Sequence, residues 1–277
     1  MLMHDPKFTV GLKSSSQKWA PYFNVALALI AGCVFAYFAG RASENFAHMA
    51  VQAGGPSFLR EPLNAGIALL LFAIWQKWRP GARFSSPKWG HVVIGLILGL
   101  IIGVALPGFA LLILSATKNA TIAPPTVNAV ALVVPFIFLI VHSFAEESLV
   151  RGIAQREGHY NFGPLAGIGL AAICFSALQA WQGYNGVWEL LNAALFGAIL
   201  GFLALGSGGI WTAIGAHAGW SYLETAVLGQ PGQIVKTQNW LAGSGSDSYG
   251  SPAFTLVLML VLGVQFALHS KAQSRKL

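Results

Sequence analysis

The stretch HSFAEESLVRG, which begins at His142, places ionisable side chains in a hydrophobic part of the chain. On a helix, residues four apart share a face, so His142 lies beside Glu146 and Glu147 lies beside Arg151. The two glutamates point about 100° apart. Arg151 can therefore hold Glu147 in an ion pair while Glu146 faces a cavity, free to bind a proton, a water or a metal ion. Because each ionisable side chain in a bilayer costs on the order of 2.5–3.5 kcal/mol, the pattern indicates a base and its support. The alternative is an interfacial ion pair at a helix end.

Two further hydrophobic segments carry polar side chains. Gln179 lies in CFSALQAWQG, and His217 and Ser221 lie one helical turn apart in IGAHAGWSYLE. Glu224, seven residues after His217, falls near the same face. A lone intramembrane histidine more often packs or bridges helices, but polar groups on three helices favour a shared site. We expect Glu146 and His217 to meet across a wet pocket and to handle one water molecule together.

The composition sets the environment of these residues. The chain has 277 residues, of which 55% are hydrophobic and only 9% charged, and its mean hydropathy is +0.63. Soluble domains are roughly 25% charged. Because a helix needs roughly 20 apolar residues to cross a bilayer, the sequence predicts an all-α, polytopic membrane helical bundle with about eight transmembrane helices. The predicted spans are Pro21–Gly40, Leu63–Trp78, His91–Ser115, Thr126–Phe144, Phe162–Trp181, Val187–Leu205, Gly208–Leu228 and Pro252–His269.

Lysine and arginine set the expected orientation, because they collect in short cytoplasmic loops. With eight spans, all the basic clusters fall on one side, so both termini are predicted to be cytoplasmic, in a bacterial inner membrane. The net charge of +7 then favours contact with the anionic lipid bilayer, and no basic groove suggests nucleic acid. These clusters consist of Lys7, Lys13, Lys18, Lys77, Arg79, Arg83, Lys88, Arg151, Arg156, Lys271, Arg275 and Lys276.

The chain is expected to form one helical domain over residues 21–270, between a cytoplasmic N-terminal tail (1–20) and a basic cytoplasmic tail (271–277). Pro124-Pro125 and the Gly/Ser-rich segment around Gly229–Gly250 interrupt it. Cys33 and Cys174 fall inside predicted spans and are interpreted as small apolar side chains. Glycines recur every fourth residue, a spacing that lets membrane helices approach closely. These glycines are Gly95, Gly99, Gly103, Gly197, Gly201, Gly215 and Gly219.

Three of these segments together resemble the motifs of the CAAX prenyl protease 2 and bacteriocin-processing (CPBP, or Abi) intramembrane proteases. The first motif, two glutamates, three residues and an arginine, is intact as Glu146, Glu147 and Arg151. The second motif reads Phe, three residues, His, and here it is Phe175 and Gln179. The third reads His, three residues, then a polar residue, and here it is His217 and Ser221. The resemblance covers about residues 130–228, and the order and spacing of the motifs carry it.

The resemblance implies an intramembrane endopeptidase that cleaves a membrane-associated protein or peptide. Glu146 would be the general base, Glu147 its partner held by Arg151, and His217 a metal ligand or proton carrier. Ser221 would help to hold the oxyanion. Phe175, His142 and Glu224 are expected to line the cavity.

Gln179 departs from the family pattern. Glutamine neither relays a proton as imidazole does nor binds zinc well, so the expected two-histidine zinc site is interrupted. Three alternatives follow: zinc held by His217 and Glu146, His142 replacing the missing imidazole, or metal-free chemistry in which Gln179 orients water or the substrate carbonyl.

The function has two competing interpretations. A catalytically impaired pseudoprotease would keep the Glu147–Arg151 pair for structure and bind a membrane partner. An ion-coupled transporter would also bury carboxylates, but no repeat relates the two halves of the sequence. The residues do not identify the substrate or the oligomeric state.

Overall fold

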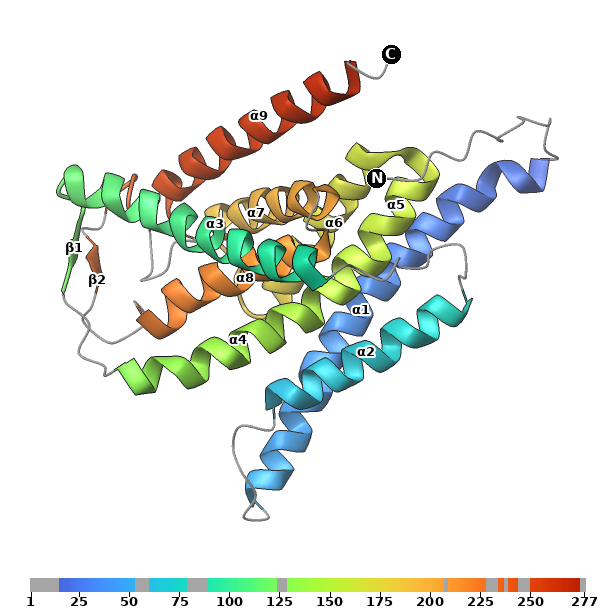
Figure 1. Cartoon of the computed structure of the whole chain (residues 1–277), viewed down its shortest axis with the longest axis horizontal. Coiled ribbons are helices and arrows are strands. Elements are labelled where there is room, and N and C mark those ends of the chain that lie inside the picture. Colours follow the sequence, from blue (N-terminus) through green and yellow to red (C-terminus); the bar gives the residue numbers. More distant parts are fainter. Residues whose placement is uncertain are drawn as a thin grey trace.

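The computed structural model describes residues 15–52, 60–78, 89–123, 129–206, 209–227, 234–236, 239–243 and 250–274. Nearly all of these residues are helical, and the helices pack as a bundle (Figure 1). The helices are α1 (Ser15–Gln52), α2 (Arg60–Trp78), α3 (Trp89–Ala116), α4 (Ala129–Leu149), η3 (Val150–Gln155), α5 (Arg156–Phe162), α6 (Pro164–Trp181), α7 (Val187–Leu205), α8 (Ile210–Ser221), η4 (Tyr222–Val227) and α9 (Pro252–Ser274).

Each of the eight predicted spans corresponds to a described helix, so the all-α prediction is correct. The count of eight membrane spans is not confirmed. Among the described residues, five helices are long and apolar enough to cross a membrane, namely α1, α3, α6, α7 and α9. The helix α2 carries charges near both ends, α4 carries the two glutamates, and α8 has only 12 residues.

A π-helical segment joins α4 to α5. The residues that flank η3, Leu149 and Arg156, both have right-handed helical backbone angles, so the chain turns without a break from Ala129 to Phe162. Figure 1 shows this rod crossing the bundle. Segments of π-helix are rare and often mark functional sites. Here the segment begins at Val150, three residues after Glu147, and contains Arg151.

The closest helix contact joins α3 to α8 through glycine, as the sequence spacing predicts. A Cβ atom at Gly99 would collide with the backbone of Thr212 and Ala216, and one at Gly219 would collide with the backbone of Leu100. Gly103 and Gly215 are equally confined by the opposite helix. These glycines let the two backbones touch, which fixes the position of α8 and therefore of His217.

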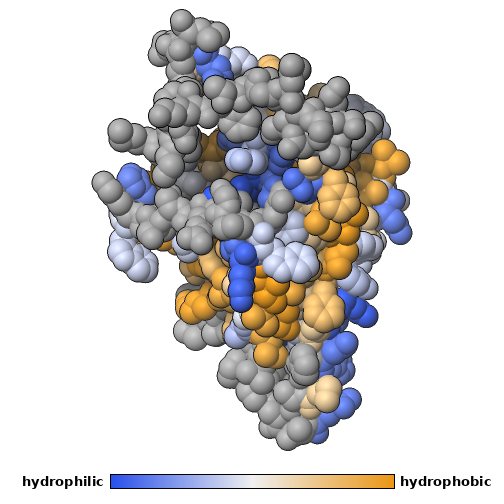
Figure 2. All heavy atoms as spheres, turned by 90° about the vertical axis from the view of Figure 1, so that its right-hand side faces the viewer, coloured by the Kyte–Doolittle hydropathy of each residue, from blue (hydrophilic) through white to orange (hydrophobic). Residues whose placement is uncertain are grey.

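Aromatic contacts identify one end of the bundle. Tyr22 near the start of α1 packs on Phe162 at the end of α5, with ring centroids 5.0 Å apart, and Phe202 of α7 packs on His269 of α9 at 5.8 Å. The described start of α1 and the described end of α9 lie at this end of the molecule (Figure 1). Figure 2 views the molecule from this side and shows hydrophilic residues in blue beside hydrophobic residues in orange.

Two short strands complete the described fold and were not expected from the sequence. The strand β1 (Ala120–Ile122) pairs antiparallel with β2 (Ile234–Lys236), and Thr121 lies opposite Val235. Pro124-Pro125 and most of the Gly/Ser-rich segment lie outside the described residues. The helix α1 already begins at Ser15, inside the predicted tail, and α9 continues to Ser274.

Candidate active site

Glu147 and Arg151 form a buried ion pair at the junction of α4 and η3. Arg151 Nη1 donates to Glu147 Oε1 at 3.0 Å, and Nε lies 2.9 Å from Oε2, so the guanidinium faces both carboxylate oxygens. The exposed fractions of the two side chains are 2% and 0%. Nη2 donates to the carbonyl oxygen of Gly197 at 2.9 Å, which ties the pair to α7. Such a fork is rigid, because arginine matches a carboxylate with two contacts.

His217 approaches the same carboxylate from α8. Its Nδ1 lies 3.0 Å from Glu147 Oε1, and its ring is buried. Phe175 of α6 holds the ring edge-to-face, with centroids 5.3 Å apart, and the guanidinium of Arg151 lies 5.2 Å from the centre of the same phenyl ring. When Nδ1 carries the proton and donates it to Glu147, Nε2 is the nitrogen that remains for chemistry.

Glu146 faces a different set of neighbours. Gln182, just beyond the end of α6, donates from Nε2 to Glu146 Oε1 at 3.1 Å, and His142 Nε2 lies 3.3 Å from the same oxygen. The second oxygen, Oε2, is buried and accepts no hydrogen bond from any described residue. A buried carboxylate oxygen without a donor is costly, so this atom calls for a water molecule or a substrate group.

The two glutamates thus have separate roles in the packing. The rings of His142 and His217 lie 6.2 Å apart, so the two carboxylates and two imidazoles form one cluster. The hydrogen-bond contact of His217 is with Glu147, whereas the sequence led us to expect a meeting with Glu146. The reason is the rotation between neighbouring helical residues: Glu147 shares the face of Arg151, which is turned toward α7 and α8.

Residues 128–223 match the family model described as type II CAAX prenyl endopeptidase Rce1-like. The segment is an Rce1-like domain. This match confirms the family that the three motifs predicted, and it contains every residue of the cluster described above. No curated protein matches the chain.

The second motif of the Rce1-like domain forms one face of α6. Phe175, Gln179 and Gln182 recur at helical spacing, and the first and last of them contact the cluster. Gln179, between them, is also buried. Gln182 was not singled out from the sequence. Its place in the sequence could have identified it, because it lies seven residues after Phe175, on the face that carries the motif.

The third motif is only partly gathered into the cluster. Ser221 ends α8, is half-buried, and accepts a hydrogen bond at its carbonyl oxygen from Thr225 Oγ1 at 2.6 Å. Its side chain forms no hydrogen bond with Glu146 or Glu147 in the described residues. Glu224 is half-buried in η4, on the next turn.

A zinc ion would need several suitable donors from this cluster. No three His, Cys, Asp or Glu side chains among the described residues are grouped so that they could hold a metal ion together. Arg151 occupies both oxygens of Glu147, and His217 uses Nδ1 on the same carboxylate. Zinc binds three or four nitrogen, thiolate or carboxylate ligands, and this arrangement does not present such a set. Zinc at His217 and Glu146 stays a prediction, and no step below depends on it.

Proposed function

We propose that the chain is an intramembrane endopeptidase that hydrolyses a peptide bond of a membrane-associated protein or peptide, with Glu146 as the general base. The observation that carries this proposal is the unpartnered, buried Oε2 of Glu146 beside an Oε1 that His142 and Gln182 hold. An oxygen so placed can accept a proton from water, and the resulting hydroxide attacks the substrate carbonyl carbon.

His217 supplies the second proton-transfer group. Glu147 accepts from Nδ1 and thereby orients the ring, and Arg151 fixes the position of Glu147 through two contacts. The proton that Glu146 takes from water can pass through Nε2 of His217 to the amine that leaves when the C–N bond breaks, which returns both groups to their starting states. Glu147 and Arg151 are positioning residues in this scheme, similar in logic to the carboxylate that orients the histidine of a serine protease.

Gln179 and Ser221 are the proposed donors to the carbonyl oxygen. Gln179 is buried on the site face of α6, and we assign its side-chain N–H groups to the substrate carbonyl oxygen. Preorganised donors of this kind are worth about 3–4 kcal/mol each in other hydrolases. Ser221 is less buried and contributes one hydroxyl donor from the end of α8.

The proposed setting is a bacterial inner membrane with both termini in the cytoplasm. The described start of α1 and end of α9 lie at one end of the bundle, which supports placing the termini on one side (Figure 1). The substrate is expected to be anchored in the same bilayer, because the cluster lies within a bundle of apolar helices.

A second candidate function is a pseudoprotease that binds a membrane partner without cleaving it. One observation favours it: Gln179 occupies the position at which the family motif carries a histidine. In this case Glu147, Arg151 and His217 would be retained because their buried contacts hold α4, α7 and α8 together.

The test is cleavage by purified protein in liposomes. The probes are a farnesylated CAAX peptide and a panel of unmodified membrane-spanning peptides, with products identified by mass spectrometry. We expect Glu146→Gln to lower cleavage by about 10²–10⁴-fold, the usual contribution of a general base. Glu44→Gln is the matched control, because Glu44 is a partly exposed carboxylate on α1 that pairs with nearby Arg41. Equal rates for wild type and Glu146→Gln would refute the assignment, and binding without cleavage in all variants would favour the pseudoprotease.

A further inference from the structure

Two buried thiols meet at the interface of α1 with α6, beside the glutamate cluster but not part of it. Cys33 of α1 and Cys174 of α6 are the two cysteines of the chain, and both are free. They belong to one hydrophobic core cluster, in which Cys33 is 9% exposed and Cys174 is fully buried. Their side chains are hydrogen-bonded to each other. The proposed hydrolysis uses neither sulfur atom.

Ring contacts on both sides of the thiols show how α1 and α6 lie against each other. Tyr22 packs on Phe162, two residues before α6 begins, with ring centroids 5.0 Å apart. Tyr37 packs on Trp181, the last residue of α6, at 4.7 Å. Positions along α1 thus meet positions along α6 in the same order, so the two helices run side by side in the same direction. The two cysteines fall between these ring pairs on their respective helices, as their contact requires.

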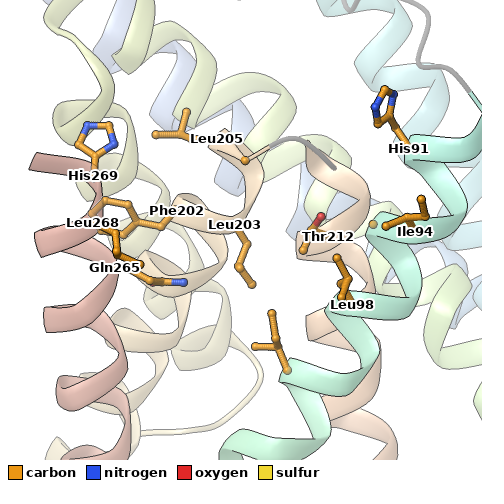
Figure 3. Close-up of a pocket in the computed structure, with 13 residues that line it drawn as sticks. His91, Ile94, Leu98, Phe202, Leu203, Leu205, Thr212, Gln265, Leu268 and His269 are labelled. Carbon is orange, nitrogen blue, oxygen red and sulfur yellow. The ribbon is translucent and has the colours of Figure 1, made fainter. Parts of the chain in front are cut away.

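The thiols lie in close-packed core rather than on a cavity wall. A Cβ atom added at Gly32, next to Cys33, would lie 3.3 Å from the Cβ atom of Ala154 in η3, so α1 packs tightly at this level. The cavity of about 460 Å³ that Figure 3 shows lies elsewhere, between α3, α7, α8 and α9, and neither α1 nor α6 lines it. Close packing holds the two sulfur atoms in reach of each other.

The position of Cys174 connects this interface to the candidate active site. Cys174 directly precedes Phe175, whose ring contacts the imidazole of His217 and the guanidinium of Arg151. A displacement of α6 at Cys174 therefore moves the ring that holds His217. The helix α1 lies outside the matched segment, residues 128–223. A covalent bond between the two sulfur atoms would join this outer helix to the second motif of the Rce1-like domain.

We propose that Cys33 and Cys174 form a redox-sensitive clamp, in which oxidation to a disulfide fastens α1 to the Rce1-like domain and slows peptide cleavage. The bond replaces a hydrogen bond between the sulfur atoms, so α6 shifts toward α1 and carries Phe175 with it. A misplacement of about 1 Å near reacting groups can lower a rate by about 10²-fold. The effect on cleavage rests on the proposed function, whereas formation of the bond does not.

Hydrogen peroxide is the proposed oxidant, because it is uncharged and little larger than water. Cys33, the more exposed of the two, attacks one peroxide oxygen, the O–O bond breaks, and a sulfenic acid and one water form. The sulfur of Cys174 then attacks the sulfenic sulfur, the S–O bond breaks, and a second water leaves with the remaining thiol proton. The two thiols lose two electrons and two protons, and one peroxide becomes two waters. A dithiol reductant reverses the bond by thiol–disulfide exchange.

The test uses the full-length protein in liposomes. Protein reduced with dithiothreitol is treated with hydrogen peroxide, its remaining thiols are blocked, and its peptides are identified by mass spectrometry. We expect one crosslinked peptide pair that contains Cys33 and Cys174, formed within a single chain. Cleavage of the substrate peptide should fall by up to about 10²-fold, and dithiothreitol should restore it. Two free thiols after peroxide treatment, or a disulfide between two copies of the chain, would overturn the clamp.

Cys33→Ala is the matched control, because it keeps a small apolar side chain and leaves Cys174 without a second thiol. Its cleavage rate should not respond to peroxide, although its methionines meet the same oxidant. Cys174→Ala serves the same purpose if Cys33→Ala does not fold. A linked wild-type protein that cleaves as fast as the reduced protein would overturn the clamp, and so would an equal loss of activity in the control.

Hydrogen–deuterium exchange makes the test independent of catalysis. In the linked protein, the amides of α1 and of the α6 peptide that contains Phe175 should exchange more slowly than in the reduced protein, because the two helices separate less often. A chain that forms the link and slows this exchange, but cleaves no substrate in either state, would refute the proposed function and support the clamp. Unchanged exchange in the linked protein would overturn the clamp and leave the proposed function intact.

Discussion

His217 Nδ1 lies 3.0 Å from Glu147 Oε1, across 70 residues of sequence. This contact connects the first and third motifs of the Rce1-like domain, and it passes through the glutamate that Arg151 already holds. The carboxylate of Glu147 thus binds both the guanidinium of Arg151, one turn further along the chain, and the imidazole of His217 on α8. The adjacent carboxylate, Glu146, keeps one oxygen without a protein donor. Glu147 is therefore held rigidly by its partners, whereas Glu146 keeps one oxygen for the proposed chemistry.

The first prediction concerns His217. His217→Gln should lower peptide cleavage by about 10²–10⁴-fold, because the proton-transfer group on α8 is lost. The fold should persist, since Arg151 continues to neutralise Glu147. Cleavage rate and thermal unfolding, measured on the same preparation, separate the two effects. His48→Gln, an exposed change on α1, is the control. Full activity in His217→Gln would remove this residue from the mechanism.

The second prediction concerns the buried ion pair. Arg151→Met leaves the carboxylate of Glu147 buried with only His217, so the free energy of unfolding should fall by about 3–5 kcal/mol. Denaturant unfolding in detergent measures the loss. The double variant Glu147→Gln with Arg151→Met should recover much of it, because no uncompensated charge is left. Arg41→Met removes an exposed cation and should change stability little. A double variant no more stable than Arg151→Met alone would contradict this account.

The sequence predicted the parts of the site that depend on local helix geometry. The pairing of Glu147 with Arg151 and the closeness of His142 to Glu146 follow from residues four apart on one helix. A spacing of four predicted that Gly99, Gly103, Gly215 and Gly219 lie in close helix contacts, although it did not predict that α3 packs on α8. Each of the eight apolar segments contains a described helix, because long hydrophobic runs are a strong sequence signal for membrane helices.

Long-range features were not predictable in the same way. Which glutamate receives His217 depends on how α8 is rotated against α4, and that rotation is set by glycine contacts that the sequence does not orient. Gln182 directly follows the last residue of α6 and is not one of the motif positions, so its helical spacing from Phe175 and Gln179 did not draw attention to it. The π-helical continuity through η3 has no distinctive residue pattern. The strands β1 and β2 pair across 114 residues at their centre, where Thr121 lies opposite Val235, and a pairing over that separation is not visible in the local sequence.

The third prediction tests Gln182. Gln182→Leu removes the donor to Glu146 Oε1, and a hydrogen bond to a charged group is worth about 1.5–3 kcal/mol. Cleavage should therefore fall by roughly 10–100-fold while substrate binding is kept. The matched change Gln52→Leu, at an exposed position of α1, should leave the rate unaltered. A rate in Gln182→Leu equal to that of wild type would show that His142 alone holds the carboxylate.

The fourth prediction concerns the glycine seam. Gly103→Ala places a methyl group against the backbone of Ala216 and should lower the melting temperature, because α3 and α8 must separate. Gly108→Ala on the same helix has nothing within 4 Å of the added Cβ, and it should raise stability by up to about 1 kcal/mol through helix propensity. Thermal unfolding of the two variants gives opposite signs. A melting temperature for Gly103→Ala at or above that of wild type would contradict the seam.

The last prediction distinguishes an active protease from an impaired one. Gln179 lies on the site face of α6, between Phe175, which packs on His217, and Gln182, which donates a hydrogen bond to Glu146. If the Gln179 amide donates to the substrate carbonyl oxygen, Gln179→Ala should lower the cleavage rate by about 10²–10³-fold, as for other oxyanion donors. In that case the cleavage rate of Gln179→His should not exceed that of wild type. If the natural protein has lost its chemistry, wild type and Gln179→Ala should both be inactive, and Gln179→His should gain cleavage that still requires Glu146. Mass-spectrometric product analysis of all three proteins, with Glu146→Gln added to the histidine variant, reads out the difference. Only the first pattern is compatible with the proposed endopeptidase.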